Sequence, residues 1–150
     1  RGTTVSIFLR ATAEGAAQNV RAAQREDLDM AAPATILVVD DDPGVRQFLA
    51  DSLDSFGYAV LEAENGEAGL EMLSRAAPDL MLVDYAMPGM TGAEVARRAR
   101  ETHAHMPIVF ASGYAETAAL ENVLDENTLI LRKPFRLGDL QDAIAKALRR

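Results

Sequence analysis

Two hydrophobic periods alternate along the chain from Thr35 onward, and together they predict an α/β domain. Three segments are continuous apolar runs of the kind that a strand buried on both faces requires, and two others are weaker strand candidates. In chain order, the five predicted strands are residues 36–39, 58–63, 80–83, 108–110 and 128–132.

Helical periodicity fills the intervals between these strands. In the first interval, apolar residues recur every three or four positions: Val45, Phe48, Leu49, Leu53 and Phe56. Asp42 can cap this helix, Pro43 suits its first turn, and Gly57 can end it. The last helix carries a similar stripe at Leu137, Leu140, Ile144 and Leu148, and shorter helices are expected near 67–75, 93–102 and 116–124. Strict alternation of five strands with five helices predicts a doubly wound parallel sheet with helices on both faces, because parallel neighbours need crossover connections.

The composition is that of a soluble globular protein, with 49% hydrophobic and 25% charged residues among 150. No apolar run approaches the roughly 20 residues of a membrane span, and residues 1–10 do not have the pattern of a signal peptide. Cysteine is absent, which excludes disulfides and thiol chemistry. We therefore expect a cytoplasmic domain that makes no membrane contact itself, although a parent protein can be membrane-attached.

The negative charge is unevenly placed. Residues 1–34 contain four basic and four acidic residues, so the net charge of −8 falls on residues 35–150. An acidic body repels a nucleic-acid backbone, and we expect no nucleic-acid partner. We interpret the cluster Arg97, Arg98 and Arg100 as a solvated helix face. His103 and His105 flank a helix end, and we expect them to carry no chemistry.

Polar side chains gather where the predicted strands end. They are Asp40, Asp41 and Asp42 after the first strand, Asp84 after the third, Ser112 after the fourth and Lys133 after the fifth. Ligands of open α/β sheets bind outside the carboxyl ends of the strands, so we expect these side chains at one rim. Converging carboxylates raise the pKa of at least one of them unless a cation intervenes. Oxygen ligands with room for water suit Mg²⁺, and a carboxylate nucleophile beside Mg²⁺ and a lysine suggests phosphoryl transfer.

Each of these residues also has a purely structural interpretation. Asp42 before Pro43 is more simply a helix cap, Ser112 can be a turn hydroxyl, and Lys133 taken alone is a surface lysine. The functional interpretation rests on their coincidence, since Lys133 is one of only two lysines and stands at a strand end. The Lys133–Pro134 bond is a candidate cis peptide that would aim the ammonium inward.

The segments ILVVDDDP, DLMLVDYAMPGMTG, PIVFASGYA and LRKPF, in this order, resemble the receiver domain of two-component response regulators over residues 35–150. The resemblance implies a flavodoxin-like sheet of order 2-1-3-4-5. It implies that Asp84 is phosphorylated by the phosphohistidine of a histidine kinase. Asp41, Asp84 and the carbonyl of Ala86 would hold Mg²⁺, and Asp40 would act on the ion directly or through water.

The resemblance also implies a switch. Ser112 and Lys133 would contact phosphoryl oxygens and shift a pre-existing equilibrium in the fourth helix and fifth strand. The sequence departs from the family at Ile130, where an aromatic residue is common. Ala86 and Tyr114 stand at positions that influence loss of the phosphoryl group, and neither can orient water through a carboxylate or amide. We therefore expect slow self-hydrolysis.

Residues 1–10 form a separate pattern. Val5, Ile7 and Leu9 share one face of an alternating strand, which precedes a complete domain and has no initiating methionine before it. The segment resembles the last strand of the ATP-binding domain of sensor histidine kinases, although Arg10 follows where that strand commonly ends in leucine-proline. We expect a strand remnant at 1–10, a linker at 11–34 and the receiver domain at 35–150, as the C-terminal piece of a hybrid histidine kinase.

Three alternatives stay open from the sequence. One is an aspartate-nucleophile phosphatase of the haloacid dehalogenase type, which the run Asp40-Asp41-Asp42-Pro43 fits poorly. Another is a stand-alone response regulator, and the third is a docking module that kept only the fold. Candidate partners are a histidine phosphotransfer protein downstream and a second copy in a homodimer.

Overall fold

The structure, a computed structural model, describes residues 33–113 and 125–149. The chain divides into two units, residues 1–32 and residues 33–150, and the description concerns the second. The expected strand at 1–10, most of the expected linker at 11–34 and the expected helix near 116–124 lie outside the described residues.

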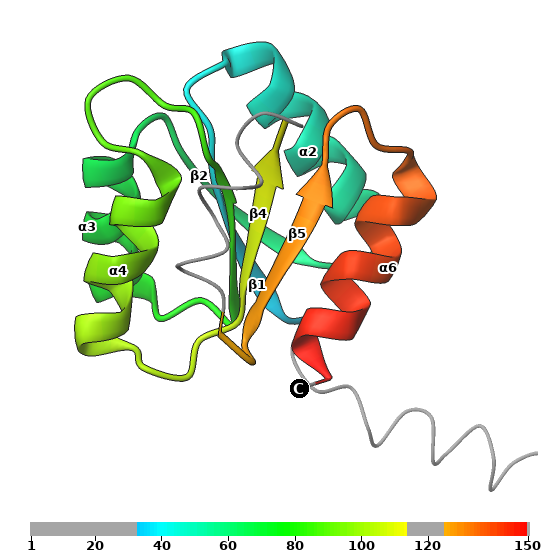
Figure 1. The fold of residues 1–150 in the computed structure, drawn as a ribbon. Coiled ribbons are helices and arrows are strands. Elements are labelled where there is room, and N and C mark those ends of the chain that lie inside the picture. The colour runs from blue at the N-terminus through cyan, green and yellow to red at the C-terminus, as the bar shows by residue number, and fades with distance from the viewer. Residues whose placement is uncertain (1–32, 114–124, 150) are drawn as a thin grey trace, which may run out of the picture. The chain divides into compact units, whose positions relative to one another are not determined.

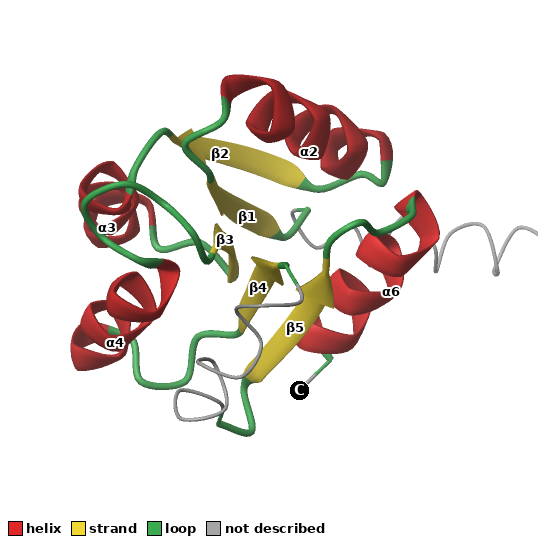
Figure 2. Cartoon of the chain, turned by 45° about the horizontal axis from the view of Figure 1, so that its top comes forward, coloured by secondary structure: helices red, strands yellow, loops and turns green. Residues whose placement is uncertain are grey.

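Five parallel strands form one sheet in the order β2-β1-β3-β4-β5, which confirms the predicted fold (Figures 1 and 2). The strands are β1 (Thr35–Val39), β2 (Ala59–Ala63), β3 (Leu80–Asp84), β4 (Ile108–Ser112) and β5 (Thr128–Arg132). The order changes direction at β1, whose neighbours are β2 and β3. A ligand site is expected at the carboxyl ends of the strands beside this point.

Four helices of the described chain cover the sheet, and none is long and apolar enough to cross a membrane. They are α2 (Pro43–Ser55), α3 (Gly66–Ala76), α4 (Gly92–Thr102) and α6 (Leu137–Leu148). Figures 1 and 2 show α3 and α4 on one face of the sheet and α2 and α6 on the other. This two-sided covering explains why the central strands read as continuous apolar runs.

Side chains on the two faces of the central strands pack into two separate hydrophobic cores. Leu37 and Val39 of β1 pack on the side of α3 and α4, whereas Ile36 and Val38 pack on the side of α2 and α6. All four are fully buried, as alternation of side chains across a pleated strand requires. A shift of one residue in register would exchange the two sets, so the packing fixes how the strand ends line up.

The start and end of α2 follow from its sequence. The Asp42 carboxylate accepts hydrogen bonds from the N–H groups of Gly44, at 2.7 Å, and Val45, at 3.0 Å. The bond from Val45 and then that from Gly44 lower the pKa of Asp42. Gly57 follows the C-cap residue Phe56 with φ of +90°, a conformation that glycine adopts without strain. The prediction of Asp42 as a cap and Gly57 as a stop is confirmed.

The interpretation of three arginines as a solvated face is confirmed for two and wrong for the third. Arg97 and Arg98 form ion pairs one helical turn away, with side chains 63% and 44% exposed. The side chain of Arg100 is only 19% exposed, and its Nε lies 3.0 Å from Asp125 Oδ2. The Arg100 guanidinium also donates to the carbonyl of Met106 and, at 3.4 Å, to the hydroxyl of Thr128. Arg100 therefore ties the end of α4 to the residues that lead into β5.

We expect Arg100→Ala to lower the free energy of unfolding by about 1 to 2 kcal/mol, because several charge-assisted hydrogen bonds are lost together. Burial raises the pKa of Asp125, but Thr128 and Arg100 outweigh it, so the net pKa is lowered. The stabilisation is thus present above the ordinary aspartate pKa and is lost as pH falls through the lowered one. Urea unfolding at pH 7 and at acid pH measures both effects. Arg97→Ala is the control, with a change within about 0.5 kcal/mol; equal losses in both variants would contradict the assignment.

Candidate phosphoryl-transfer site

Four strand ends bring the predicted residues to one rim. Asp40 follows β1 directly, Asp84 and Ser112 are the last residues of β3 and β4, and Lys133 follows β5. Main-chain hydrogen bonds extend the strand pairing into this rim: Asp40 N–H donates to Ala63 at 3.2 Å, and Lys133 N–H donates to Ser112 at 2.8 Å. The backbone under the side chains is therefore part of the sheet.

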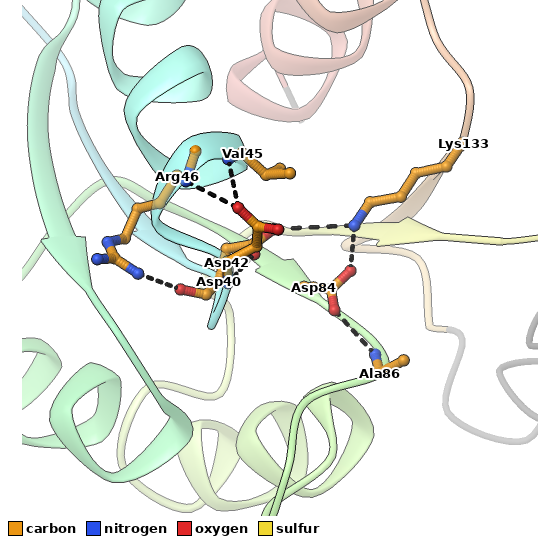
Figure 3. A network of polar contacts seen from close by, with 8 residues as sticks. Asp40, Asp42, Val45, Arg46, Asp84, Ala86 and Lys133 are labelled. Atoms are coloured by element: carbon orange, nitrogen blue, oxygen red, sulfur yellow. Dashed lines mark hydrogen bonds and ion pairs between the residues drawn. The ribbon is translucent and has the colours of Figure 1, made fainter.

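The Asp84 carboxylate is held from both sides. Lys133 Nζ donates to Asp84 Oδ1 at 2.5 Å, and the N–H of Ala86 donates to Asp84 Oδ2 at 3.1 Å (Figure 3). Asp84 is 6% exposed, whereas the Lys133 side chain is 34% exposed. The Lys133–Pro134 peptide, the candidate for a cis bond, is cis. A buried carboxylate thus has one fixed donor on each oxygen.

Asp40 is the second buried carboxylate of the rim. Its Oδ1 accepts from the N–H of Asp42 at 2.9 Å, while its Oδ2 has no hydrogen-bond donor and lies 3.8 Å from Lys133 Nζ. Burial raises the pKa of Asp40; the Asp42 N–H and Lys133 oppose this. The negative charges of Asp84 and Asp41 add to the rise. A buried carboxylate oxygen without a hydrogen-bond donor is an unfavourable arrangement unless a cation compensates it, and the Lys133 ammonium at 3.8 Å is beyond hydrogen-bonding distance.

We expect Asp40→Asn to stabilise the free domain by about 1 to 2 kcal/mol at pH 7, because the amide removes a buried charge. The raised pKa of Asp40 means that the ionised form weakens the fold above that pKa and that the cost disappears as pH falls below the ordinary value. The difference from the wild type should therefore shrink towards pH 3. Thermal unfolding across this pH range measures it, with the exposed Asp142→Asn as control. An Asn variant less stable than the wild type at neutral pH would contradict the argument.

The predicted metal ligands are brought together only in part. Asp40 and Asp84 converge on Lys133, whereas Asp41 is exposed. Within residues 33–113 and 125–149, no three histidine, aspartate or glutamate side chains form a metal-binding group by themselves. The two buried carboxylates that remain, one of which has an oxygen without a hydrogen-bond donor, are chemically suited to Mg²⁺, which binds a few carboxylates and keeps several waters.

Ser112 is fully buried at the end of β4, and its hydroxyl donates to the carbonyl of Gly113 at 3.1 Å. The hydroxyl is therefore on the rim, as predicted, and engaged by the neighbouring residue. His103 lies at the other end of the sheet, since it caps the end of α4 before β4 begins, and its Nδ1 is 2.8 Å from Thr102 Oγ1.

Arg46 is a residue of the rim that the sequence analysis did not single out. Its guanidinium donates from Nη1 to the main-chain carbonyl of Asp40 at 2.7 Å (Figure 3). Its Nε lies 3.7 Å from Glu62 Oε2 of β2. One signal was present: Arg46 follows the cap residue Asp42 by four positions, which places both on one side of the helix start.

With this geometry established, comparison with known proteins defines the class. Residues 36–145 match the model of the response regulator receiver domain. The chain belongs to this family.

Two curated relatives from Brucella abortus (strain 2308) show how such domains are used. The chain is 35% identical to the sensor kinase CckA in an alignment that covers 99% of this chain and 17% of that protein. It is 38% identical to the response regulator receiver protein CpdR over 75% of this chain and 95% of that protein. Among solved structures, a response regulator receiver protein from Sinorhizobium medicae matches with a TM-score of 0.73 and 32% identity, over 79% of this chain and 96% of that one. The chain thus spans nearly all of one relative and about a sixth of another.

Proposed function

We propose that Asp84 accepts a phosphoryl group from the phosphohistidine of a histidine kinase. The observation that carries this proposal is the Asp84 carboxylate itself, which is buried at the rim between the Lys133 ammonium and the Ala86 N–H. A carboxylate oriented in this way can attack in line, and the cation beside it offsets the charge that the phosphoryl group brings.

The chemistry balances without further reactants. An Asp84 oxygen forms a bond to phosphorus as the N–P bond of phosphohistidine breaks, and the imidazole leaves with the bonding electron pair. An acyl phosphate and a free histidine result. Lys133 exchanges its contact with Asp84 Oδ1 for one with a phosphoryl oxygen, so the ammonium stays paired throughout.

The carboxylates of Asp40, Asp41 and Asp84, with the carbonyl of Ala86, are the residues that would hold Mg²⁺. The ion would neutralise phosphoryl oxygens when bound. The donorless Oδ2 of Asp40 supports this part of the proposal. These residues would supply oxygen ligands at fixed positions around the rim.

The proposal includes a switch at the other strand ends. After phosphorylation, the Ser112 hydroxyl leaves the Gly113 carbonyl and donates to a phosphoryl oxygen, and the movement shifts an equilibrium in β5. The fourth helix of the sequence prediction, 116–124, lies outside the described residues. Ile130 of β5 packs against the core on the side of α3 and α4, so any readout there works through packing rather than through an aromatic hydroxyl.

The test is to incubate the chain with a small acyl phosphate and Mg²⁺ and to map the modified residue by mass spectrometry. We expect one phosphoryl group on Asp84 that hydroxylamine removes and that chelation of Mg²⁺ prevents from forming. Asp84→Asn should abolish the label, and the exposed Asp142→Asn should keep it. A label that persists in Asp84→Asn, or no label in the wild type, would favour a docking module without phosphorylation.

We also propose that this receiver belongs to a hybrid histidine kinase and works in the cytoplasm. The match to a sensor kinase runs over 99% of the chain, which includes residues outside the receiver model. A histidine phosphotransfer protein would then be a candidate next acceptor, and a homodimer stays a candidate assembly. The match to nearly the whole of CpdR keeps a stand-alone regulator as the second candidate. Slow amide exchange at residues 1–10 in a monomer, equal to that at 36–39, would count against the kinase remnant.

Family membership favours a receiver over the haloacid dehalogenase-type phosphatase. The receiver model spans residues 36–145 and so includes all the strand ends that form the site.

A further inference from the structure

We infer that Arg46 is a positioning residue that sets Mg²⁺ affinity by fixing the peptide group between Asp40 and Asp41. The inference deepens the proposed function and rests on it, because both aspartates are proposed metal ligands. It is carried by the two contacts of the Arg46 side chain and by the place of the carbonyl that it binds.

The carbonyl of Asp40 belongs to the peptide plane that joins Asp40 to Asp41. This plane is rigid, so its rotation alters the backbone dihedral before it and the one after it. The directions in which both carboxylates leave the backbone therefore depend on where this one carbonyl points. Arg46 Nη1 donates a hydrogen bond to it at 2.7 Å.

The hydrogen bonds of the other polar atoms of Asp40 do not fix the direction of its carbonyl. The Asp40 N–H is bound to Ala63 at 3.2 Å, and Oδ1 accepts from Asp42 at 2.9 Å. Neither of these two contacts involves the carbonyl of Asp40. Only Oδ2 lacks a donor, and it is the atom that would face the ion.

Arg46 can hold the plane because its own guanidinium is fixed. The side chain is 17% exposed, and it spans from α2 to Glu62 on β2, where Nε and Oε2 are 3.7 Å apart. Glu62 lies opposite Val38 in the register of β1 and β2, next to the pair of Val39 and Ala63. The planar guanidinium of Arg46 thus connects the start of α2 with Glu62 of β2 and with the peptide group between Asp40 and Asp41.

A lysine at this position keeps the positive charge but lacks the planar guanidinium with its several N–H donors. An ammonium is a point charge on a flexible stem, so it cannot contact the carbonyl and Glu62 with fixed geometry. Arg46→Lys consequently separates positioning from electrostatics. Residues that orient metal ligands typically contribute 10- to 100-fold to metal affinity, and for one peptide contact we expect about a 10-fold weaker Mg²⁺ affinity.

The experiment uses Mg²⁺ alone as the probe and follows the main-chain amide signals of residues 40–42 by NMR during titration. Arg46→Lys should raise the dissociation constant about 10-fold, while Arg98→Lys, an exposed arginine of α4, should leave it unchanged. In phosphorylation by an acyl phosphate, Arg46→Lys should need more Mg²⁺ for half the maximal rate and reach the wild-type rate at saturation. A role confined to stability would not move this midpoint.

The outcomes separate the inference from the function beneath it. A wild type that binds no Mg²⁺ at millimolar concentration would overturn the proposed function. A wild type that binds Mg²⁺ together with an Arg46→Lys variant of equal affinity would overturn only the role of Arg46. A lower saturating rate in Arg46→Lys would also overturn it, because the defect would then lie in the reaction.

Discussion

Replacement of Lys133 by methionine is expected to slow phosphoryl uptake by Asp84 about 100-fold. The ammonium is 2.5 Å from Asp84 Oδ1, and the methionine side chain keeps the length of the lysine stem without the charge. Loss of a preorganised cation at a site where negative charge accumulates has an effect of this order. The rate of labelling by an acyl phosphate at fixed Mg²⁺ measures it.

The same variant should be less stable by about 1 to 2 kcal/mol at pH 7, a figure discounted because the Lys133 side chain is a third exposed. Without Lys133, one of the influences that lower the pKa of Asp40 is gone, so that raised pKa rises further. The ionised form then weakens the fold more strongly above its pKa, and the loss shrinks as pH falls through it. Lys146→Met, the only other lysine, exposed on α6, is the control for both measurements. Unchanged uptake in Lys133→Met would remove Lys133 from the proposed chemistry.

Hydrophobic periodicity was sufficient to predict the order and type of the strands and helices, because the central strands are buried on both faces. The apolar run at 80–83 predicts β3, and the structure extends it by one residue to Asp84. The run at 108–110 likewise extends to Ser112. Each of these two strands ends in a polar residue, Asp84 or Ser112, so the hydrophobic pattern stops before the strand does, although the backbone ladder continues. The site residues are therefore the ends of strands, and the rule for open sheets predicted their convergence.

Contacts that depend on side-chain direction were beyond the sequence pattern. Arg97, Arg98 and Arg100 look alike in the sequence. The different role of Arg100 arises because the pairing of β5 with β4 brings Asp125 and Thr128 within its reach. Arg46 likewise acquires its role from a carbonyl at the end of β1. Neither partner follows from helical spacing within the arginine's own helix.

Gly92→Ala is expected to destabilise the domain by about 3 kcal/mol and to reduce phosphoryl uptake. A Cβ at Gly92 would lie 2.4 Å from the main-chain oxygen of Asp84 and 3.0 Å from the Cα of Tyr85. These are backbone atoms, and the Gly92 N–H already donates to the Tyr85 carbonyl at 2.9 Å, while the Tyr85 N–H donates to Ala111 at 3.0 Å. The backbone that carries Asp84, the proposed phosphoacceptor, must shift to admit the methyl group. Displacements of about 1 Å at a reacting group can cost roughly 100-fold in rate.

Gly138→Ala is the matched control for this substitution. Gly138 lies in the first turn of α6, and a Cβ there meets no atom within 4 Å. Alanine should therefore stabilise the helix by about 0.5 to 1 kcal/mol, the opposite sign to Gly92→Ala, and leave uptake unchanged. Urea unfolding and labelling of the two variants side by side distinguish a general glycine effect from the contact with Asp84. If Gly92→Ala were as stable as the wild type and equally fast in uptake, the close approach of α4 to the end of β3 would not support the site.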